Sequence, residues 1–291
     1  MPSLRDIRGR IRSVGSTAQI TRAMQMVAAS KMRKAQQATL AMRPFGQLLY
    51  RIQRQATTHA RDFSHPLLEA REVHKRAVIL IGTDRGLCGS LNTSLFRVAS
   101  QFDSATTLFI TAGKRPAQFI ARTHRQLAAE FPLPDSPRFA DARPIAALAR
   151  DLFLNREVDQ VQILVTQFVN TMTQRTRLVE FLPVGEIKGL EIPGAESEAE
   201  LAIDQTQVVF EPGPEAVLSY LLGHYLNIIV YRALLEAKAS EQSARMMAMT
   251  NASDNAAGLI EDLRLEYNKL RQGAVTRELL EIAGGRLGNN G

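Results

Sequence analysis

The chain has 291 residues, a net charge of +7 and one cysteine. This length suits two domains, or one domain with an extended element. A single cysteine excludes both an intrachain disulfide and a zinc site built on several cysteines. The apolar share of 45% supports a folded core, and the basic charge favours an acidic partner: nucleic acid, an anionic membrane surface or an acidic protein.

Metal and membrane signals are weak in this composition. The five histidines show no metal-ligand spacing, so neither a metal nor another cofactor is expected. No uninterrupted apolar run approaches the roughly 20 residues that span a bilayer.

The N-terminal segment, residues 1–58, is expected to be a coiled-coil helix beginning near Ser3. One heptad phase runs through it without interruption, which is typical of a coiled-coil seam. Pro44 removes a backbone hydrogen bond, so a kink is expected there while the helix continues. The heptad positions are Ile7, Val14, Thr21, Ala28, Ala35, Met42, Leu49 and Ala56.

Residues 76–183 are expected to form a central Rossmann-like α/β domain. The apolar run 77–81, ended by Gly82, is typical of a buried strand in a parallel sheet. The alternation of strands and helices that follows predicts a small α/β sandwich. Further strands are expected at 107–111, 160–168 and 177–182, and helices at 91–102, near 116–123 and from Pro144 to Leu154.

The loop 83–90 follows a strand and precedes a helix, where phosphate groups often bind. It lacks both GxGxxG and GxxxxGK[ST], so glycines that shape a tight turn are the preferred interpretation. A dinucleotide-dependent enzyme stays open as an alternative at this point.

An acidic linker and foot, 184–211, leads to a second coiled-coil helix within 212–291. This helix is expected from Pro214 to about Ile282, with the glycines at 284, 285 and 288 ending it. It is longer than its N-terminal partner, so its apolar end is expected to project alone. Its seam is Ala256, Ile260, Leu263, Tyr267, Leu270 and Ala274.

Four sequence blocks carry a family resemblance. They read ITRAMQMVAASKMRK at 20–34, TDRGLCGSLN at 83–92, ARMMAMTNASDN at 244–255 and YNKLRQ at 267–272, with Thr276 and Glu278. In this order they resemble the gamma subunit of F-type ATP synthases over nearly the whole chain. The resemblance implies an antiparallel coiled coil of the two terminal helices inside a ring of alpha and beta subunits. It also implies an α/β domain against the epsilon subunit and the membrane ring of c subunits.

The resemblance implies a rotor role with no chemistry of its own. Rotation of the chain would couple ion flow through the c ring to ATP synthesis in the alpha/beta ring, at the cytoplasmic face of a bacterial plasma (inner) membrane, with the chain bound peripherally. The alternative is a basic coiled-coil adaptor for nucleic acid or a membrane surface. Aromatic residues are only 6% and tryptophan is absent, which disfavours nucleic acid.

The resemblance also implies contact residues, each of which has a simpler interpretation as part of a solvated helix face. Phe210 and Glu211 correspond to a foot that meets the c ring, although they are also consistent with a plain helix start. The residues expected to face the beta subunits are Lys31, Arg33, Lys34, Arg245, Arg271 and Gln272.

Overall fold

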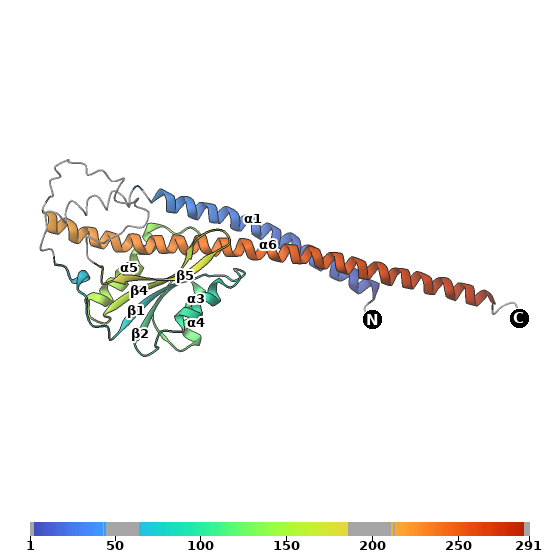
Figure 1. Cartoon of the computed structure of the whole chain (residues 1–291), viewed down its shortest axis with the longest axis horizontal. Coiled ribbons are helices and arrows are strands. Elements are labelled where there is room, and N and C mark those ends of the chain that lie inside the picture. The colour runs from blue at the N-terminus through green and yellow to red at the C-terminus, as the bar shows by residue number, and fades with distance from the viewer. Residues whose placement is uncertain (1–2, 43, 45–63, 186–210, 212, 288–291) are drawn as a thin grey trace. The chain divides into compact units, whose positions relative to one another are not determined.

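The computed structural model describes residues 3–42, 44, 64–185, 211 and 213–287. Two helices dominate it, α1 (Leu4–Ala41) and α6 (Pro214–Leu287), and they enclose the α/β segment in sequence (Figure 1). The remaining helices are η1 (Pro66–Leu68), α3 (Leu91–Ala99), α4 (Lys114–Arg122) and α5 (Phe139–Leu154). The strands are β1 (Arg76–Ile81), β2 (Thr107–Ala112), β3 (Gln126–Phe131), β4 (Gln160–Phe168) and β5 (Gln174–Leu182).

The five strands form one sheet in the order β3-β2-β1-β4-β5. β1 lies at its centre and pairs in parallel with β2 and β4, so Ile79 stands between Ile110 and Ile163. β5 is antiparallel to β4. The mostly parallel sheet confirms the α/β fold class, and residues 77–81 of its central strand are buried, as the continuous apolar run predicts.

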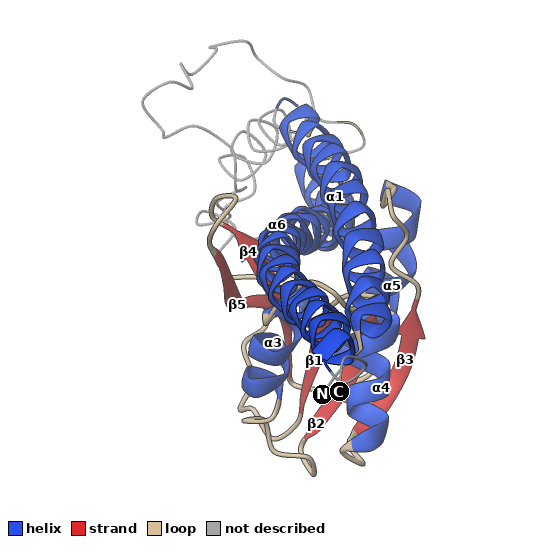
Figure 2. Cartoon of the chain, turned by 90° about the vertical axis from the view of Figure 1, so that its right-hand side faces the viewer, coloured by secondary structure: helices blue, strands red, loops and turns tan. Residues whose placement is uncertain are grey.

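The sheet is covered on both faces. α5 and the first part of α6 pack on one face, where Phe153 and Leu226 belong to the larger core cluster. α3 and α4 pack on the other face, where Leu95 and Ile120 meet β1 and β2 (Figure 2). The chain therefore buries both faces of its parallel strands with helices.

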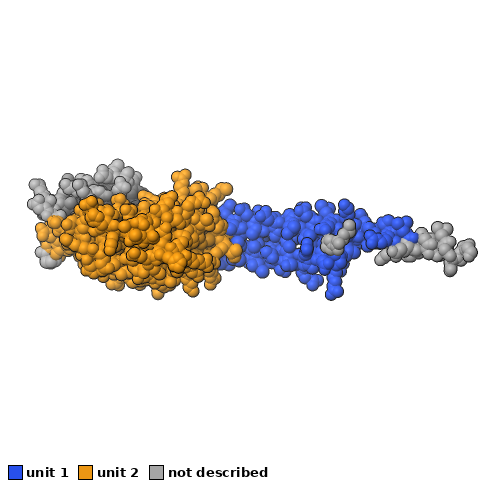
Figure 3. Space-filling view, turned by 90° about the horizontal axis from the view of Figure 1, so that it is seen from below, with its two compact units in different colours: residues 1–28, 246–291 blue, residues 29–245 orange. Residues whose placement is uncertain are grey.

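The chain divides into two compact units (Figure 3). Unit 1 comprises residues 1–28 and 246–291, and unit 2 comprises residues 29–245. Unit 1 therefore holds the start of α1 and the second half of α6, whereas unit 2 holds the sheet with the remaining parts of both helices. The four-part division expected from the sequence stays a prediction.

The long helices differ from the sequence prediction at their ends. α1 ends at Ala41, before Pro44, and its expected continuation to residue 58 lies largely outside the described residues. α6 runs to Leu287, so the prediction that the glycines at 284 and 285 end it was wrong. Glycine lowers helix propensity by only about 1 kcal/mol, which does not stop an established helix.

Two smaller elements also differ. β3 is a strand that the sequence prediction missed, and it is an edge strand with mostly exposed side chains. α5 begins at Phe139 instead of Pro144, because the Arg138 backbone N–H donates to the Asp141 carboxylate at 2.7 Å and fixes an earlier first turn.

By length and composition, α6 is apolar enough to cross a membrane, contrary to the sequence expectation. An 18-residue window within Pro214–Arg277 reaches a mean hydropathy of 1.2, and 39% of it is buried. Leu222, Leu226 and Val230 belong to the core that packs on the sheet. Packing within the chain therefore accounts for part of this hydropathy.

Candidate functional site

Unit 1 is an antiparallel helix pair. The Arg8 guanidinium donates to the Tyr267 hydroxyl, and the Thr21 and Ser253 hydroxyls are hydrogen-bonded at 2.7 Å. Between these two contacts the residue number rises along α1 and falls along α6, so the two helices run in opposite directions. The expected pairing of the two ends of the chain is confirmed within this unit.

The seam positions of unit 1 are the ones that become buried. On α1, Ile7 is 1% exposed and Thr21 is 9% exposed, and on α6 Leu263 is 7% exposed. Leu4, Ile11, Val14 and Ala18 are at least half-buried on the same face. The heptad positions of α1 and the seam positions of α6 thus identified the contact face of both helices.

The second half of α6 extends beyond the start of α1. The register set by Arg8 and Tyr267 places Leu4 opposite residue 271 or thereabouts. Beyond that point Val275, Leu279 and Leu280 are 50%, 62% and 68% exposed. An apolar helix end is therefore left uncovered within unit 1.

The predicted basic cluster on α1 divides into two kinds of residue. Lys31 forms an ion pair with Asp135 at 2.6 Å, whereas Arg33 and Lys34 are exposed. Lys31 and its partner both belong to unit 2, where Asp135 lies in the loop between β3 and α5. The Lys31 hydrogen bond, followed by the Lys238 charge, holds the pKa of Asp135 below its ordinary value.

The predicted contact residues on α6 also lie in different environments. The side chain of Arg245 is 10% exposed, pairs with Glu241 at 2.8 Å and donates to the Gly86 carbonyl at 3.2 Å. Arg271 and Gln272 are exposed on unit 1. Glu211 is exposed, and Phe210 lies outside the described residues. The structure therefore brings Lys31 and Arg245 into one network and leaves the others apart from it.

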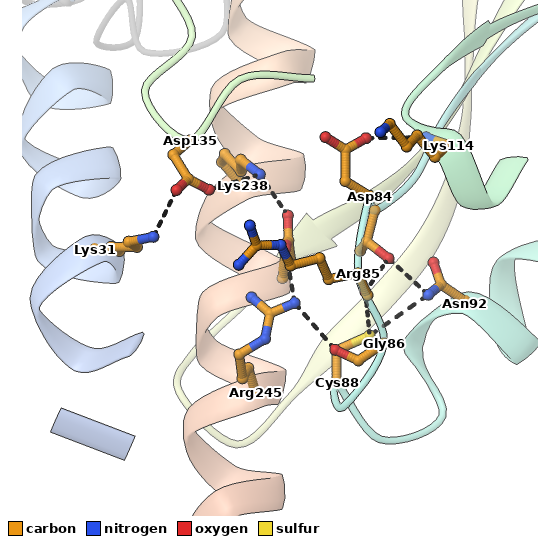
Figure 4. A network of polar contacts seen from close by, with 12 residues as sticks. Lys31, Asp84, Arg85, Gly86, Cys88, Asn92, Lys114, Asp135, Lys238 and Arg245 are labelled. Atoms are coloured by element: carbon orange, nitrogen blue, oxygen red, sulfur yellow. Dashed lines mark hydrogen bonds and ion pairs between the residues drawn. The ribbon is translucent and has the colours of Figure 1, made fainter. Parts of the chain in front are cut away.

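Three residues of this network were missed by the sequence interpretation: Asp135, Lys238 and Glu241. Figure 4 labels the first two of them. Lys238 lies 2.8 Å from Glu241 and 3.7 Å from Asp135. The signal for it was the run KASEQSAR at 238–245, where charged residues occupy a helix that is otherwise expected to be covered.

A second charged group lies along α6. Burial lowers the pKa of Arg232 and raises that of Glu236, while their mutual attraction opposes both shifts. The Arg177 charge on β5 also favours the ionised form of Glu236. This charged group therefore includes residues of α6 and of the edge strand β5.

The loop after β1 is a compact turn. The Asp84 carboxylate accepts from the Lys114 backbone N–H at 2.9 Å and so occupies the N-terminus of α4. The Asn92 amide donates to the Thr83 hydroxyl at 2.7 Å, and Gly89 has a positive φ of 58°. A side-chain carboxylate thus takes the position at which a phosphate would be held.

Cys88, in the same loop, is buried and reduced. Burial raises the pKa of its thiol, and the nearby Arg245 charge opposes that shift. No group of three potential metal ligands occurs among the described residues.

The fold defines a class of protein in which both ends of one chain form an antiparallel coiled coil and an α/β domain lies between them in sequence. A family model described as ATP synthase matches residues 3–286. The chain is 43% identical to the ATP synthase gamma chain of Opitutus terrae, over 97% of each chain. It is 40% identical to that of Heliobacterium modesticaldum, over 98% of each chain. The chain belongs to the gamma-chain family of ATP synthases.

Solved structures agree with this assignment. The central stalk and c-ring structure of the Tetrahymena thermophila mitochondrial ATP synthase contains a chain that is 26% identical, with a TM-score of 0.60. This match covers 80% of the present chain and 99% of the other. A chain in the Euglena gracilis mitochondrial enzyme in rotational state 3 is 20% identical with a TM-score of 0.67, over 98% and 93%, and shows the fold alone.

The rotor-stalk role expected from the sequence is confirmed by this family membership. A basic adaptor for nucleic acid or membranes finds no support among these relatives.

Proposed function

We propose that this chain passes rotation between a c-subunit ring in the membrane and a catalytic ring of alpha and beta subunits. The single observation that carries the proposal is the uncovered end of α6, where Val275, Leu279 and Leu280 are exposed beyond the last turn of α1. Exposed apolar residues on a helix end favour contact with another protein. An apolar surface without directional bonds suits a helix that turns inside a sleeve.

The basic contacts of the proposal rest on residues whose side chains form no hydrogen bond or ion pair with another described residue. Arg33 and Lys34 on α1, together with Arg271 and Gln272 on α6, are exposed and are proposed to face the beta subunits. Exposed ion pairs contribute about 0–1 kcal/mol each, so they can form and break as the chain turns.

Arg245 is proposed to act differently from these residues. It is buried and already paired with Glu241, so its contribution to a beta-subunit contact would come through the loop that it holds. Lys31 is likewise engaged with Asp135, although its side chain is 36% exposed. Glu211 is exposed and is proposed, with Phe210, to meet the c ring.

The chain is proposed to be a non-catalytic subunit. The epsilon subunit is proposed to bind the α/β domain. The assembly is proposed to lie at the cytoplasmic face of a bacterial plasma membrane, where the chain would be a peripheral component. The Asp84 carboxylate occupies the N-terminus of α4, which favours a non-catalytic subunit over one with a nucleotide site in the loop 83–90.

Purification of the native complex through an affinity tag on this chain tests the proposal. Alpha, beta, epsilon and c subunits are expected to co-purify, and reconstituted vesicles should make ATP when an ion gradient is imposed. A complex that synthesises ATP at the same rate after this chain has been omitted would overturn the proposal.

A further inference from the structure

Residues 237–245 of α6 are buried on every side of the helix, although most of them are polar. Lys238, Glu241 and Arg245 are 2%, 3% and 9% exposed. A helix covered all round is normally apolar, because apolar packing carries no desolvation cost. We call this segment, together with the groups that bond to it, the polar collar.

One side of the polar collar is a chain of charges. Lys31 on α1 pairs with Asp135, which also lies 3.7 Å from Lys238. Glu241 uses one carboxylate oxygen for Lys238 and the other for Arg245, each at 2.8 Å. Arg245 then donates to the Gly86 carbonyl in the loop after β1 (Figure 4).

Another side of the polar collar is bonded to the sheet. The Ser240 hydroxyl donates to the Thr166 carbonyl of β4 at 2.8 Å. The Ser243 hydroxyl donates to the Thr171 carbonyl at 2.7 Å, in the turn between β4 and β5. Successive residues on a helix point about 100° apart, so the serines and the charged residues hold different sides of α6.

Directional bonds on different sides of one helix fix its rotation as well as its position. An apolar surround would resist turning or sliding of α6 only through side-chain packing, because apolar contacts are non-directional. Rotation of α6 here would pull Lys238 away from Asp135 and Arg245 away from the Gly86 carbonyl, and it would break both serine bonds to the sheet. Buried polar and charged groups that lose their partners are strongly unfavourable.

We propose that the polar collar is a torsional joint that fixes the rotational position of α6 in the α/β domain. Asp135 extends the joint to α1 through Lys31, so both helices are held by the same loop. This inference rests on the rotor role, since torque applied to the α/β domain must enter α6 where the domain surrounds it. Glu241 is the central positioning residue, because it holds the Lys238 and Arg245 side chains through which α6 reaches Asp135 and Gly86.

The test uses the native complex with Glu241→Gln, with Asp135→Asn and with the control Glu261→Gln. Glu261 lies on the same helix but is exposed in unit 1. Amide hydrogen exchange of residues 237–245 is measured in each complex, along with ion pumping per ATP hydrolysed. Asp135 is 63% exposed, so its variant is expected to fold even where Glu241→Gln does not assemble.

Glu241→Gln should raise exchange in residues 237–245 at least tenfold and lower the pumping ratio at least twofold, and Asp135→Asn should raise exchange in residues 29–35 about threefold. The control should match the wild type. Wild-type exchange and pumping in the assembled Asp135→Asn complex, or in Glu241→Gln where it assembles, would overturn the joint and leave the rotor role intact. A wild-type complex in which hydrolysis never drives pumping would instead overturn the rotor role on which the joint rests.

Discussion

Tyr225, on α6, loses its phenolic proton at a higher pH than a free tyrosine, because the fold buries its phenol. Burial raises its pKa from 10.0 to about 12, and the Arg232 charge opposes part of that shift. Between these values the unfolded chain has lost the phenolic proton and the folded chain has kept it, so the free energy of unfolding falls as pH rises through this window.

Tyr225→Phe should remove this alkaline loss. The raised pKa corresponds to a loss of roughly 2–3 kcal/mol of folding stability between pH 10 and 12, and the variant should not show this loss. Denaturation series at several pH values provide the measurement, and Tyr220→Phe, at a residue that is 69% exposed, is the matched control. An alkaline slope in Tyr225→Phe equal to that of the wild type would contradict the assignment.

Gly82, at the end of β1, is needed for a close approach to α4. A Cβ added there would lie 2.5 Å from Pro116 Cγ and 3.2 Å from Leu95 Cδ2. The proline ring is rigid, so the strand and helix must separate, at a cost of about 1–3 kcal/mol. Chemical denaturation of Gly82→Ala should report this loss.

Gly86→Ala is the control for that prediction, because its nearest contact would be Arg115 Nη2 at an ordinary 3.6 Å. Equal stability losses in the two alanine variants would show that the approach to Pro116 is not the cause.

At this residue scale the sequence identified two members of the charge network but not their partners. Lys31 and Asp135 are 104 positions apart, and Gly86 and Arg245 are 159 apart. Periodicity reports which side of a helix is covered, not which distant loop covers it. Burial of Arg245 inside its own chain therefore required the folded structure.

At the scale of a single element, Gly258 can be tested because it lies on the exposed side of α6. A Cβ added there meets nothing within 4 Å. Gly258→Ala should stabilise the chain by up to about 1 kcal/mol, because alanine loses less backbone entropy in a helix. Denaturation and amide exchange across unit 1 measure the gain. The neighbouring exposed Ala257→Gly should produce the opposite change, and a loss of stability in Gly258→Ala would refute the argument.

Substitutions at the uncovered end of α6 should hardly change the stability of the isolated chain, but they should weaken its binding in the complex. Leu279→Ser with Leu280→Ser should change the free energy of unfolding by no more than about 0.5 kcal/mol, since both side chains are largely exposed. The same double variant should bind the catalytic ring more weakly in a reconstitution assay.

Leu263→Ser is the matched control for the helix end. Its side chain is 7% exposed in the seam, so it should cost about 2–5 kcal/mol. Unchanged binding of the Leu279/Leu280 double variant to the ring would remove this end from the interface.

The elements that the sequence predicted share strong periodicity or long apolar runs. β1 and β4 are buried strands read from such runs, and the α1 seam follows its heptad. β3 was missed because QLAAEF has no apolar alternation and its two alanines are common in helices. An edge strand gains its place from pairing with β2, which local sequence does not report.

At the scale of the whole molecule, the exposed basic residues can be changed without disturbing the polar collar. Arg33→Glu with Lys34→Glu, leaving Lys31 in place, should preserve assembly and lower gradient-driven ATP synthesis several-fold. Both residues are exposed, so the loss would come from contacts with the catalytic ring. Including Lys31→Glu would also place a carboxylate against Asp135, so the double variant is the cleaner test.

ATP synthesis in reconstituted vesicles measures this prediction. Normal coupled synthesis in the Arg33/Lys34 variant would remove both residues from the proposed bearing. Loss of synthesis accompanied by loss of assembly would assign them to building the complex, which also contradicts the prediction.

Rotation of this chain against the catalytic ring is the most direct test of its proposed function. Cys88 is the sole cysteine and is buried, so Gln118→Cys on the exposed side of α4 provides one reactive position for a probe. With the complex immobilised through its catalytic ring, ATP should drive stepwise rotation of the probe in one direction. A probe that stays fixed while the same complexes hydrolyse ATP would contradict the rotor role.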